Sequence, residues 1–267
     1  MSKLLVKPSA PDALGRVTHV TPQSAGWTYV GFDLHRLPSG RVIEADTGDR
    51  EACLVLVSGR AQIAAGGEDF GTVGERSSPF GGKPHSVYVP AGSHWRVTAA
   101  TDLTLAVCSA PGRPGARKAR FIGPTDLGQE TRGKGTNTRY VTNILPETAE
   151  ADSLLVVEVI TPGGHTSSYP PHKHDVDNLP LESLLEETYY HRLSPAQGFA
   201  FQRVYTDDRS LDETMAVEDG DVTLVPKGYH PCAATHGYDL YYLNVMAGPK
   251  RLWRFHNAPE HEWLLRS

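Results

Sequence analysis

The sequence predicts an all-β protein made of two tandem β-barrel domains. Short runs rich in β-branched and aromatic residues follow one another at close spacing, with turn residues between them, which is the pattern of a β-sandwich or barrel. The 20 prolines and 26 glycines among 267 residues favour turns and short strands over long helices. An internal repeat, described below, indicates that the barrel occurs twice. We therefore expect an N-terminal barrel over residues 1–125 and a C-terminal barrel over residues 126–267.

The first half of the chain contains several candidate strands. Residues 1–25 are polar and contain proline, so we expect an arm or an edge strand there. The segment from Trp27 to Leu37 alternates but changes phase, which indicates a strand with a bulge near Tyr29. The run ACLVLVSGRAQIAAGG has a turn signal at Ser58 and predicts a hairpin. Two further strands are expected in SVYVPAGSHWRVTA and LTLAVCSA.

Residues 110–139 interrupt this pattern with glycine, proline and charge, and we place the domain boundary or crossover there. Within this segment TRGKGTN suggests a phosphate loop, but it lacks the spacing of a P-loop. We interpret it as a turn-rich connector. The β-rich runs resume after it as LLVVEVITPGG, ETYYHRL, FAFQRVYTDD, DVTLVPKG and YDLYYLNVMAG.

The repeat is visible as two landmarks that share one offset of 136 residues. The run PAGSH, which ends at His94, corresponds to PKGYH, which ends at His230, and Glu51 corresponds to Glu187. The first copy has no His-x-His pair before its glutamate, only SGRVIEADTGDR. We therefore expect the N-terminal barrel to be a degenerate, metal-free copy and the C-terminal barrel to carry the site.

Composition and charge restrict the functional class. The formal net charge of −5 gives no support for nucleic-acid binding. No apolar run is long enough to span a membrane or to act as a signal peptide, so we expect a cytoplasmic protein without a membrane partner. Cys53, Cys108 and Cys232 are scattered and odd in number, which indicates reduced thiols.

The second half contains candidate metal ligands. His172 and His174 are separated by one residue, so on a strand both imidazoles lie on one face. With Glu187 and His230 they offer three imidazoles and one carboxylate, a plausible set for one divalent ion. The run LESLLEE before Thr188 also fits a short amphipathic helix with solvated glutamates. The repeat favours Glu187 in a strand.

These residues resemble the two cupin motifs. His-x-His followed by a glutamate forms the first motif, and Gly220, Pro226, Gly228 and His230 match the second with one residue fewer before the histidine. The gap between His174 and Glu187 is longer than is usual in cupins. The resemblance implies a bicupin, in which each barrel is a double-stranded β-helix or jelly roll.

The runs YPPHKHD, LEETYYHR, QRVYTDDRSLDET, VPKGYHP and GYDLYYLNVMAGP are similar to those of the 5-deoxy-glucuronate isomerases of bacterial myo-inositol catabolism. The resemblance implies an aldose–ketose isomerase that converts 5-deoxy-D-glucuronate to 5-dehydro-2-deoxy-D-gluconate. It also implies a divalent metal, zinc in the first place, with manganese or iron as alternatives. A metal would polarise the carbonyl and stabilise an enediolate. Proton transfer and a hydride shift both remain open.

Roles for other side chains follow from this chemistry. The candidates for the catalytic base are Glu187, Tyr189 and Tyr241. A cation is expected on the substrate carboxylate, with Arg203 as the first choice and Lys227 or Arg192 as the backups. Hydroxyl groups for a polyol are available from several tyrosines, of which we expect two in the pocket; the set is Tyr189, Tyr205, Tyr229, Tyr241 and Tyr242.

Three alternatives fit the same ligands. A metal-dependent cupin dioxygenase or a related uronate isomerase would use the same three histidines and one glutamate as metal ligands, because this kind of site supports many reactions. A non-enzymatic, sugar-binding bicupin is the third. By analogy with cupins, a homo-oligomer formed through sheet edges is plausible.

Overall fold

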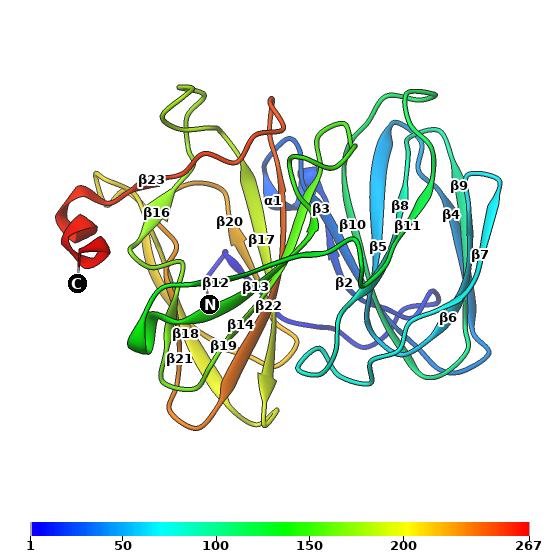
Figure 1. Ribbon diagram of the computed structural model, residues 1–267, viewed down its shortest axis with the longest axis horizontal. Coiled ribbons are helices and arrows are strands. Elements are labelled where there is room, and N and C mark those ends of the chain that lie inside the picture. The colour runs from blue at the N-terminus through cyan, green and yellow to red at the C-terminus, as the bar shows by residue number, and fades with distance from the viewer. Residues whose placement is uncertain (1, 267) are drawn as a thin grey trace. The chain divides into compact units, whose positions relative to one another are not determined.

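The computed structural model describes residues 2–266, and β-strands dominate them (Figure 1). Helical structure in this range is limited to α1 (Pro22–Ala25) and two 3-10 segments, η1 (Gly135–Asn137) and η2 (Pro259–Leu265). The predicted all-β class is therefore confirmed. The strands form two compact units, which we call the N-terminal unit (residues 8–128 and 143–156) and the C-terminal unit (residues 1–7, 129–142 and 157–267). No helix in the described range is long and apolar enough to cross a membrane.

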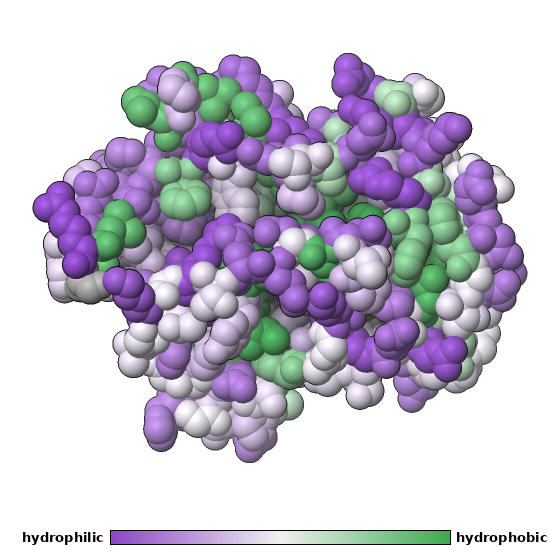
Figure 2. Space-filling model, in the orientation of Figure 1, coloured by the Kyte–Doolittle hydropathy of each residue, from purple (hydrophilic) through white to green (hydrophobic). Residues whose placement is uncertain are grey.

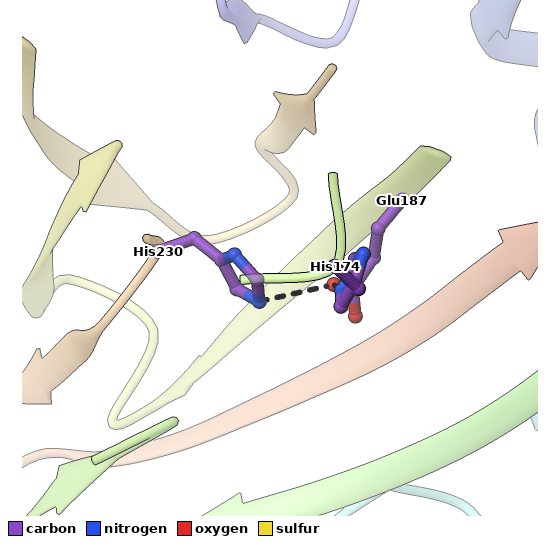
Figure 3. Close-up of side chains that lie close together, drawn as sticks. All are labelled: His174, Glu187 and His230. Atoms are coloured by element: carbon purple, nitrogen blue, oxygen red, sulfur yellow. Dashed lines mark hydrogen bonds and ion pairs between the residues drawn. The ribbon is translucent and has the colours of Figure 1, made fainter. Parts of the chain in front are cut away.

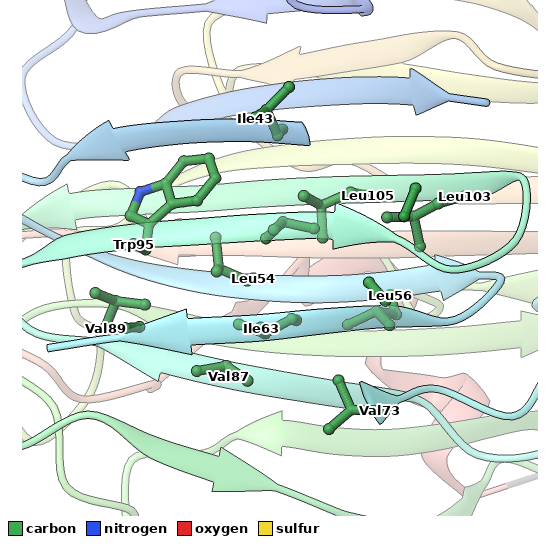
Figure 4. Packing of buried hydrophobic residues seen from close by; sticks show 14 of the residues in the cluster. Ile43, Leu54, Leu56, Ile63, Val73, Val87, Val89, Trp95, Leu103 and Leu105 are labelled. Carbon is green, nitrogen blue, oxygen red and sulfur yellow. The ribbon is translucent and has the colours of Figure 1, made fainter. Parts of the chain in front are cut away.

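The N-terminal unit contains a six-stranded and a four-stranded antiparallel sheet. The six-stranded sheet has the order β11-β8-β5-β10-β3-β2, with bounds Arg120–Ile122, His85–Val89, Arg50–Ser58, Leu103–Pro111, Gly31–Leu37 and Arg16–Val20. The four-stranded sheet has the order β4-β9-β6-β7, with bounds Val42–Asp46, His94–Ala99, Ala61–Ala65 and Glu68–Val73. Apolar side chains from both sheets, among them Leu54, Trp95 and Leu105, pack into one buried cluster (Figure 4). Burial of this cluster is the main stabilising contribution to the unit.

The C-terminal unit has most of a seven-stranded sheet, together with a four-stranded sheet and a small strand pair. The seven-stranded order is β1-β20-β17-β22-β14-β13-β12, with bounds Leu5–Val6, Val222–Val225, Glu186–Ser194, Asp239–Ala247, Leu155–Thr161, Arg139–Leu145 and Gly128–Arg132. The four-stranded order is β15-β21-β18-β19, with bounds Thr166–Ser167, Cys232–Ala234, Phe199–Tyr205 and Asp212–Glu218. In the small pair, β16 (His172–Lys173) lies antiparallel to β23 (His256–Asn257).

The repeat inferred from the sequence is present in the strands. Shifting residue numbers by 136 turns β5 into β17, Glu186–Ser194, and β10 into β22, Asp239–Ala247, without any change of bounds. The sheet orders also correspond, because β8-β5-β10-β3 matches β20-β17-β22-β14. The two units are therefore copies of one double-sheet barrel.

The units do not follow a single cut after residue 125. Residues 1–7 belong to the C-terminal unit, because β1 pairs with β20 through Leu5–Thr223 and Val6–Val222. Residues 143–156 belong to the N-terminal unit, although they follow the predicted boundary. These assignments depend on pairing between distant segments, which the local sequence pattern does not encode.

Two local predictions were wrong. The strand expected from Trp27 begins at Gly31, and the Trp27 indole N–H donates to the carbonyl of Val30 at 2.8 Å. The hairpin expected around Ser58 does not form, because β5 pairs with β8 and β10 while β6 pairs with β7 and β9. Strand β5 is buried along most of its length and has a neighbour on each side, so no edge is left for β6.

Candidate metal centre

Three of the four predicted ligands meet inside the C-terminal unit (Figure 3). Glu187 is near the start of β17, His174 follows β16, and His230 lies in the turn between β20 and β21. Glu187 Oε2 is 3.1 Å from His174 Nε2 and 3.3 Å from His230 Nε2. All three side chains are buried. This is a compact donor set of two imidazoles and one carboxylate, which suits a divalent ion.

The other ring nitrogens define the tautomers. His174 Nδ1 lies 2.9 Å from the Leu185 carbonyl, and His230 Nδ1 lies 2.8 Å from the Gly228 carbonyl. A carbonyl only accepts, so each Nδ1 carries a proton and donates it. In a neutral ring Nε2 then has no proton and presents a lone pair. The Nε2 lone pairs of His174 and His230 both face the Glu187 carboxylate. Acceptors that face one another in this way require a proton or a cation between them, and these residues fit a divalent ion.

Burial affects the protonation of the three histidines. It lowers the pKa of His230, and it lowers the pKa of His172 well below the ordinary value. Burial also opposes protonation of His174, but the hydrogen bond and the charge of Glu187 raise the pKa of that ring. The Nε2 atom of His230 is buried and has no hydrogen-bond partner among the described residues. An orphaned imidazole nitrogen beside a carboxylate is the form that ligates a metal.

His172 stands beside this group rather than within it. The atoms that approach within 4.8 Å of one another belong to His174, Glu187 and His230, and His172 is not among them. The ring centroid of His172 lies 4.8 Å from that of His230 and 4.6 Å from that of Phe255. As a ligand, His172 stays a prediction.

The insert between the motifs holds the ligands in place. Gly228 N–H donates to Asp175 Oδ1 at 2.6 Å, and Leu185 N–H donates to the His174 carbonyl at 3.0 Å. Gly228 has φ 94°, and a Cβ there would lie 2.5 Å from the Tyr205 carbonyl oxygen, so the turn that delivers His230 needs glycine. The LESLLEE run is not helical, and Glu187 lies on a strand.

The surface of this insert is partly apolar. Val176 and Leu181 are exposed, and Figure 2 shows hydrophobic residues at the surface over the loop between β16 and β17. The loop itself is closed by hydrogen bonds, since Glu182 Oε1 accepts the N–H groups of Asp175 and Val176. The loop therefore has internal hydrogen bonds and is also bonded to the backbone of His174 and Gly228.

Two cavities adjoin the centre. The inner one, of about 20 Å³, is lined by Glu187, Tyr189, Tyr242, Asn244 and Trp253 among others. The outer one, of about 790 Å³, is within the size range of small-molecule sites. The two cavities share Arg132, Arg139 and His172. The outer cavity has room for a sugar-sized ligand, but none of His174, Glu187 and His230 lines it; the inner cavity is the one that reaches Glu187.

The structure separates the tyrosine candidates. Tyr189 lines the inner cavity, and its hydroxyl lies 3.0 Å from Ser168 Oγ. Tyr242 lines the same cavity, whereas the Tyr241 hydroxyl donates to Glu158 at 3.0 Å on the other face of β22. Burial raises the pKa of Tyr189 well above its usual value, so its hydroxyl keeps its proton.

The remaining predicted substrate contacts are not among the cavity-lining residues. Arg203 makes a bidentate ion pair with Asp212 at 2.7 Å and is partly exposed. Lys227 is exposed. Tyr205 and Tyr229 pack in a small buried cluster with Ala258, and neither of them lines the inner or the outer cavity.

Sequence reasoning missed Arg132 and Arg139. Both lie in the segment interpreted as a connector, more than thirty residues before His172. Two arginines that flank a glycine-rich turn were the available signal. The pairing of β12 with β13, and of β13 with β14, brings them to the cavity.

In the N-terminal unit, the residue equivalent to Glu187 has a different environment. The Glu51 carboxylate accepts the backbone N–H groups of Asp152, Ser153 and Leu154 at 2.8, 2.6 and 2.6 Å, and the Tyr88 hydroxyl at 2.5 Å. His94, the counterpart of His230, is exposed and lies 3.0 Å from Asp46. Donors thus surround this carboxylate where a cation would have to lie.

An all-β chain of two such barrels, with a histidine–glutamate centre in one of them, is a bicupin. The chain matches the KduI/IolB family over residues 4–264 and belongs to that family. The 5-deoxy-glucuronate isomerase of Geobacillus kaustophilus is 56% identical over 268 residues, which cover 100% of this chain and 97% of that protein.

Solved structures give the same result. An IolB-like protein from Salmonella typhimurium LT2 is 54% identical, with a TM-score of 0.95 over 98% of this chain and 99% of that one. The oxalate decarboxylase of Bacillus subtilis, a protein with Mn(II) centres, is 15% identical, with a TM-score of 0.61 over 90% of this chain and 74% of that one. At that identity the likeness shows the fold alone.

Proposed function

We propose that the protein is an aldose–ketose isomerase that converts 5-deoxy-D-glucuronate to 5-dehydro-2-deoxy-D-gluconate in myo-inositol catabolism. The observation that carries this proposal is the 56% identity, over the whole chain, to a protein named for that activity. The buried group of His174, Glu187 and His230 supports it, because an inner cavity lined by Glu187 shares Arg132, Arg139 and His172 with a sugar-sized outer cavity.

The proposed cofactor is zinc, with manganese and iron as the alternatives. His174, Glu187 and His230 would hold it, and His172 is the proposed fourth ligand. When bound there, a divalent ion supplies a Lewis acid that polarises a substrate carbonyl. The carbonyl groups of Leu185 and Gly228 accept the Nδ1–H groups of His174 and His230, so Nε2 of each ring would be the atom that binds the ion.

The isomerisation moves a hydrogen between adjacent carbons, so the chain must hold and move protons beside the substrate. Tyr189 is the proposed hydroxyl donor, because it lines the inner cavity and Ser168 fixes its hydroxyl oxygen. Glu187 stays a candidate base. Tyr242 and Asn244 line the same cavity and present polar groups to a polyol. We assign no catalytic role to Tyr241, whose hydroxyl bonds to Glu158.

The test is a turnover experiment in deuterated water. Metal-loaded protein is incubated with 5-deoxy-glucuronate, and ketose formation is followed by NMR. Ketose is expected, and deuterium at the carbon that gains hydrogen would indicate proton transfer rather than a hydride shift. Absence of ketose with zinc, manganese and iron would refute the isomerase. Oxygen consumption would instead indicate a dioxygenase, and binding without turnover a sugar-binding protein.

The oligomeric state and the cellular location stay predictions. A homo-oligomer is tested by light scattering of the purified chain. A cytoplasmic location is tested by fractionation of cells that express it.

A further inference from the structure

We propose that the segment from Arg132 to Arg139 forms a carboxylate-binding subsite, in which Arg139 and Arg132 hold the acid group of the substrate. This inference rests on the proposed function for the identity of the acid. It assigns a role to the TRGKGTN run, which spacing alone identifies only as a connector. The segment supplies six of the residues that line the outer cavity; they are Arg132, Gly133, Lys134, Thr136, Asn137 and Arg139.

Arg139 carries a positive charge that the protein leaves without a carboxylate partner. Its Nη1 donates to the backbone carbonyl and the side-chain oxygen of Asn137 at 3.0 and 3.1 Å, and both acceptors are neutral. Within residues 2–266, no ion pair joins Arg139 to an acidic side chain. It is half-buried and lines both cavities. A guanidinium held in this way keeps donors and charge available for an anion.

Arg132 brings a second charge to the same place. Its Nη2 donates to Glu130 at 2.7 Å, and its guanidinium lies 5.1 Å from the ring centroid of Trp253, a residue that lines the inner cavity. Glu130 offsets part of the charge of Arg132, and a carboxylate bound between the two guanidinium groups would offset the repulsion between them.

The segment is built to hold Arg139 in place. Asn137 is itself fixed, because its Nδ2 donates to the Tyr169 carbonyl at 3.0 Å and its Oδ1 accepts from Thr166 at 3.2 Å. Gly133 has φ 78°, and a Cβ there would lie 2.1 Å from the Asn137 carbonyl oxygen and 2.7 Å from Arg139 Nη1. Glycine at this position lets the loop close around the guanidinium. The subsite is therefore preorganised.

The position of the subsite selects a class of substrate. Arg132, Arg139 and His172 line both cavities, and the inner cavity also reaches Glu187. A sugar that extends from the ligand group through the inner cavity into the outer one therefore passes both arginines. The subsite favours carbonyl sugars that also carry a carboxylate.

The experiment compares an acid and a neutral sugar. Activity is measured with 5-deoxy-glucuronate and with 5-deoxy-glucose, which has a hydroxymethyl group in place of the carboxylate. For Arg139→Gln we expect kcat/KM with the acid to fall about 100-fold, the value of a charge-assisted bidentate contact, through KM. For the same variant, kcat/KM with the neutral sugar should change less than about threefold. An equal loss with both sugars, or no loss with the acid, would overturn the proposal.

Matched variants make the result specific. Arg132→Gln, at a side chain already paired with Glu130, should reduce the preference for the acid about tenfold, and it provides the test if Arg139→Gln does not fold. Arg139→Lys keeps the charge but loses the guanidinium fork, so it should recover part of the acid preference. Arg96→Gln, in an exposed ion pair with Glu44 in the N-terminal unit, is the surface control. A loss of acid preference in Arg203→Gln, with Arg139→Gln unaffected, would assign the acid group to Arg203 and contradict the subsite.

Failure of the subsite and failure of the proposed function give different results. If the wild-type protein binds 5-deoxy-glucuronate in calorimetry but forms no ketose, the isomerase proposal fails. Weaker binding of the acid by Arg139→Gln would then still support the subsite, and unchanged binding would overturn it. If ketose forms and Arg139→Gln prefers the acid over the neutral sugar as strongly as the wild type does, the subsite proposal is wrong and the isomerase proposal is retained. Metal content, measured for each variant, should equal that of the wild type.

Discussion

Glu51 and Glu187 occupy the same position of equivalent strands, β5 and β17, yet their carboxylates have opposite environments. Glu51 accepts three backbone N–H groups and one tyrosine hydroxyl, whereas Glu187 faces the Nε2 atoms of two histidines. Both carboxylates are buried. One anion is therefore satisfied by donors of the N-terminal unit, and the other is arranged to share a cation.

Glu51→Gln should destabilise the N-terminal unit without affecting metal binding. The amide keeps one acceptor oxygen but places an NH₂ group against backbone N–H donors of the 152–154 turn. Loss of these charge-assisted bonds in a buried site should cost about 3 kcal/mol of unfolding free energy. Urea denaturation measures the loss. A stability equal to that of the wild type, or a loss of bound metal, would contradict this assignment.

Glu187→Gln should have the converse effect. It removes the only carboxylate of the ligand group, so metal content should fall at least tenfold and turnover at least about 100-fold. Stability of the metal-free protein should fall at acid pH, because the variant removes the hydrogen bond and the charge by which Glu187 raises the pKa of His174, and should change little at alkaline pH, where that ring is neutral. Metal analysis after dialysis, with denaturation of the apoprotein, checks both parts. Full metal content in Glu187→Gln would show that the ligand group is wrongly assigned.

Tyr189→Phe and Tyr241→Phe should separate catalysis from packing. Tyr189 lines the inner cavity, so loss of its hydroxyl should lower kcat about 100-fold. Tyr241 bonds to buried Glu158, so the same change there should lower stability by about 1–3 kcal/mol and leave kcat within about threefold. Steady-state kinetics and thermal unfolding of both variants provide the test. A larger fall in kcat for Tyr241→Phe would restore Tyr241 as the catalytic candidate.

His191 should make the metal-free C-terminal unit sensitive to acid. Burial lowers the pKa of His191 to about 3, and the side chains that face it are neutral: Tyr189, Gln202, Thr223 and Tyr242. The unfolded chain binds the proton near the ordinary pKa of about 6.5. The folded state does not bind it until about pH 3. Protonation of His191 in the unfolded chain thus does not lower the free energy of unfolding above about pH 6.5, and lowers it progressively as the pH falls from there toward 3.

The measurement is urea denaturation of the apoprotein at a series of pH values. In this window the wild type should lose up to about 1.4 kcal/mol per pH unit more than His191→Gln does. His236→Gln, at an exposed turn, is the matched control and should follow the wild type. Parallel stability curves for wild type and His191→Gln would show that this histidine does not contribute.

The sequence was sufficient where the signal is local or repeated. Alternation of side chains in short runs predicted the strands, and the shared offset of Glu51 and Glu187 predicted two copies with one ligand group. It also favoured a strand over a helix for the segment that carries Glu187. Tyr189 and Tyr242 line the inner cavity, but the sequence did not distinguish Tyr242 from its neighbour Tyr241. That choice depends on register, since Tyr242 lies opposite His191 and Tyr241 opposite Arg192.

The sequence by itself determined the doubled barrel and the copy that carries the His-x-His pair, and it predicted the candidate ligands. Tertiary structure decided which cations line the cavity, because strand pairing brings Arg132 and Arg139 to it while Arg203, on β18, is not among the residues that line either cavity. It also decided the function of Glu51, since the donors around that carboxylate come from a turn a hundred residues away in the chain. Strand alternation is a local property, whereas the partners of a buried charge are set by which segments the fold brings together.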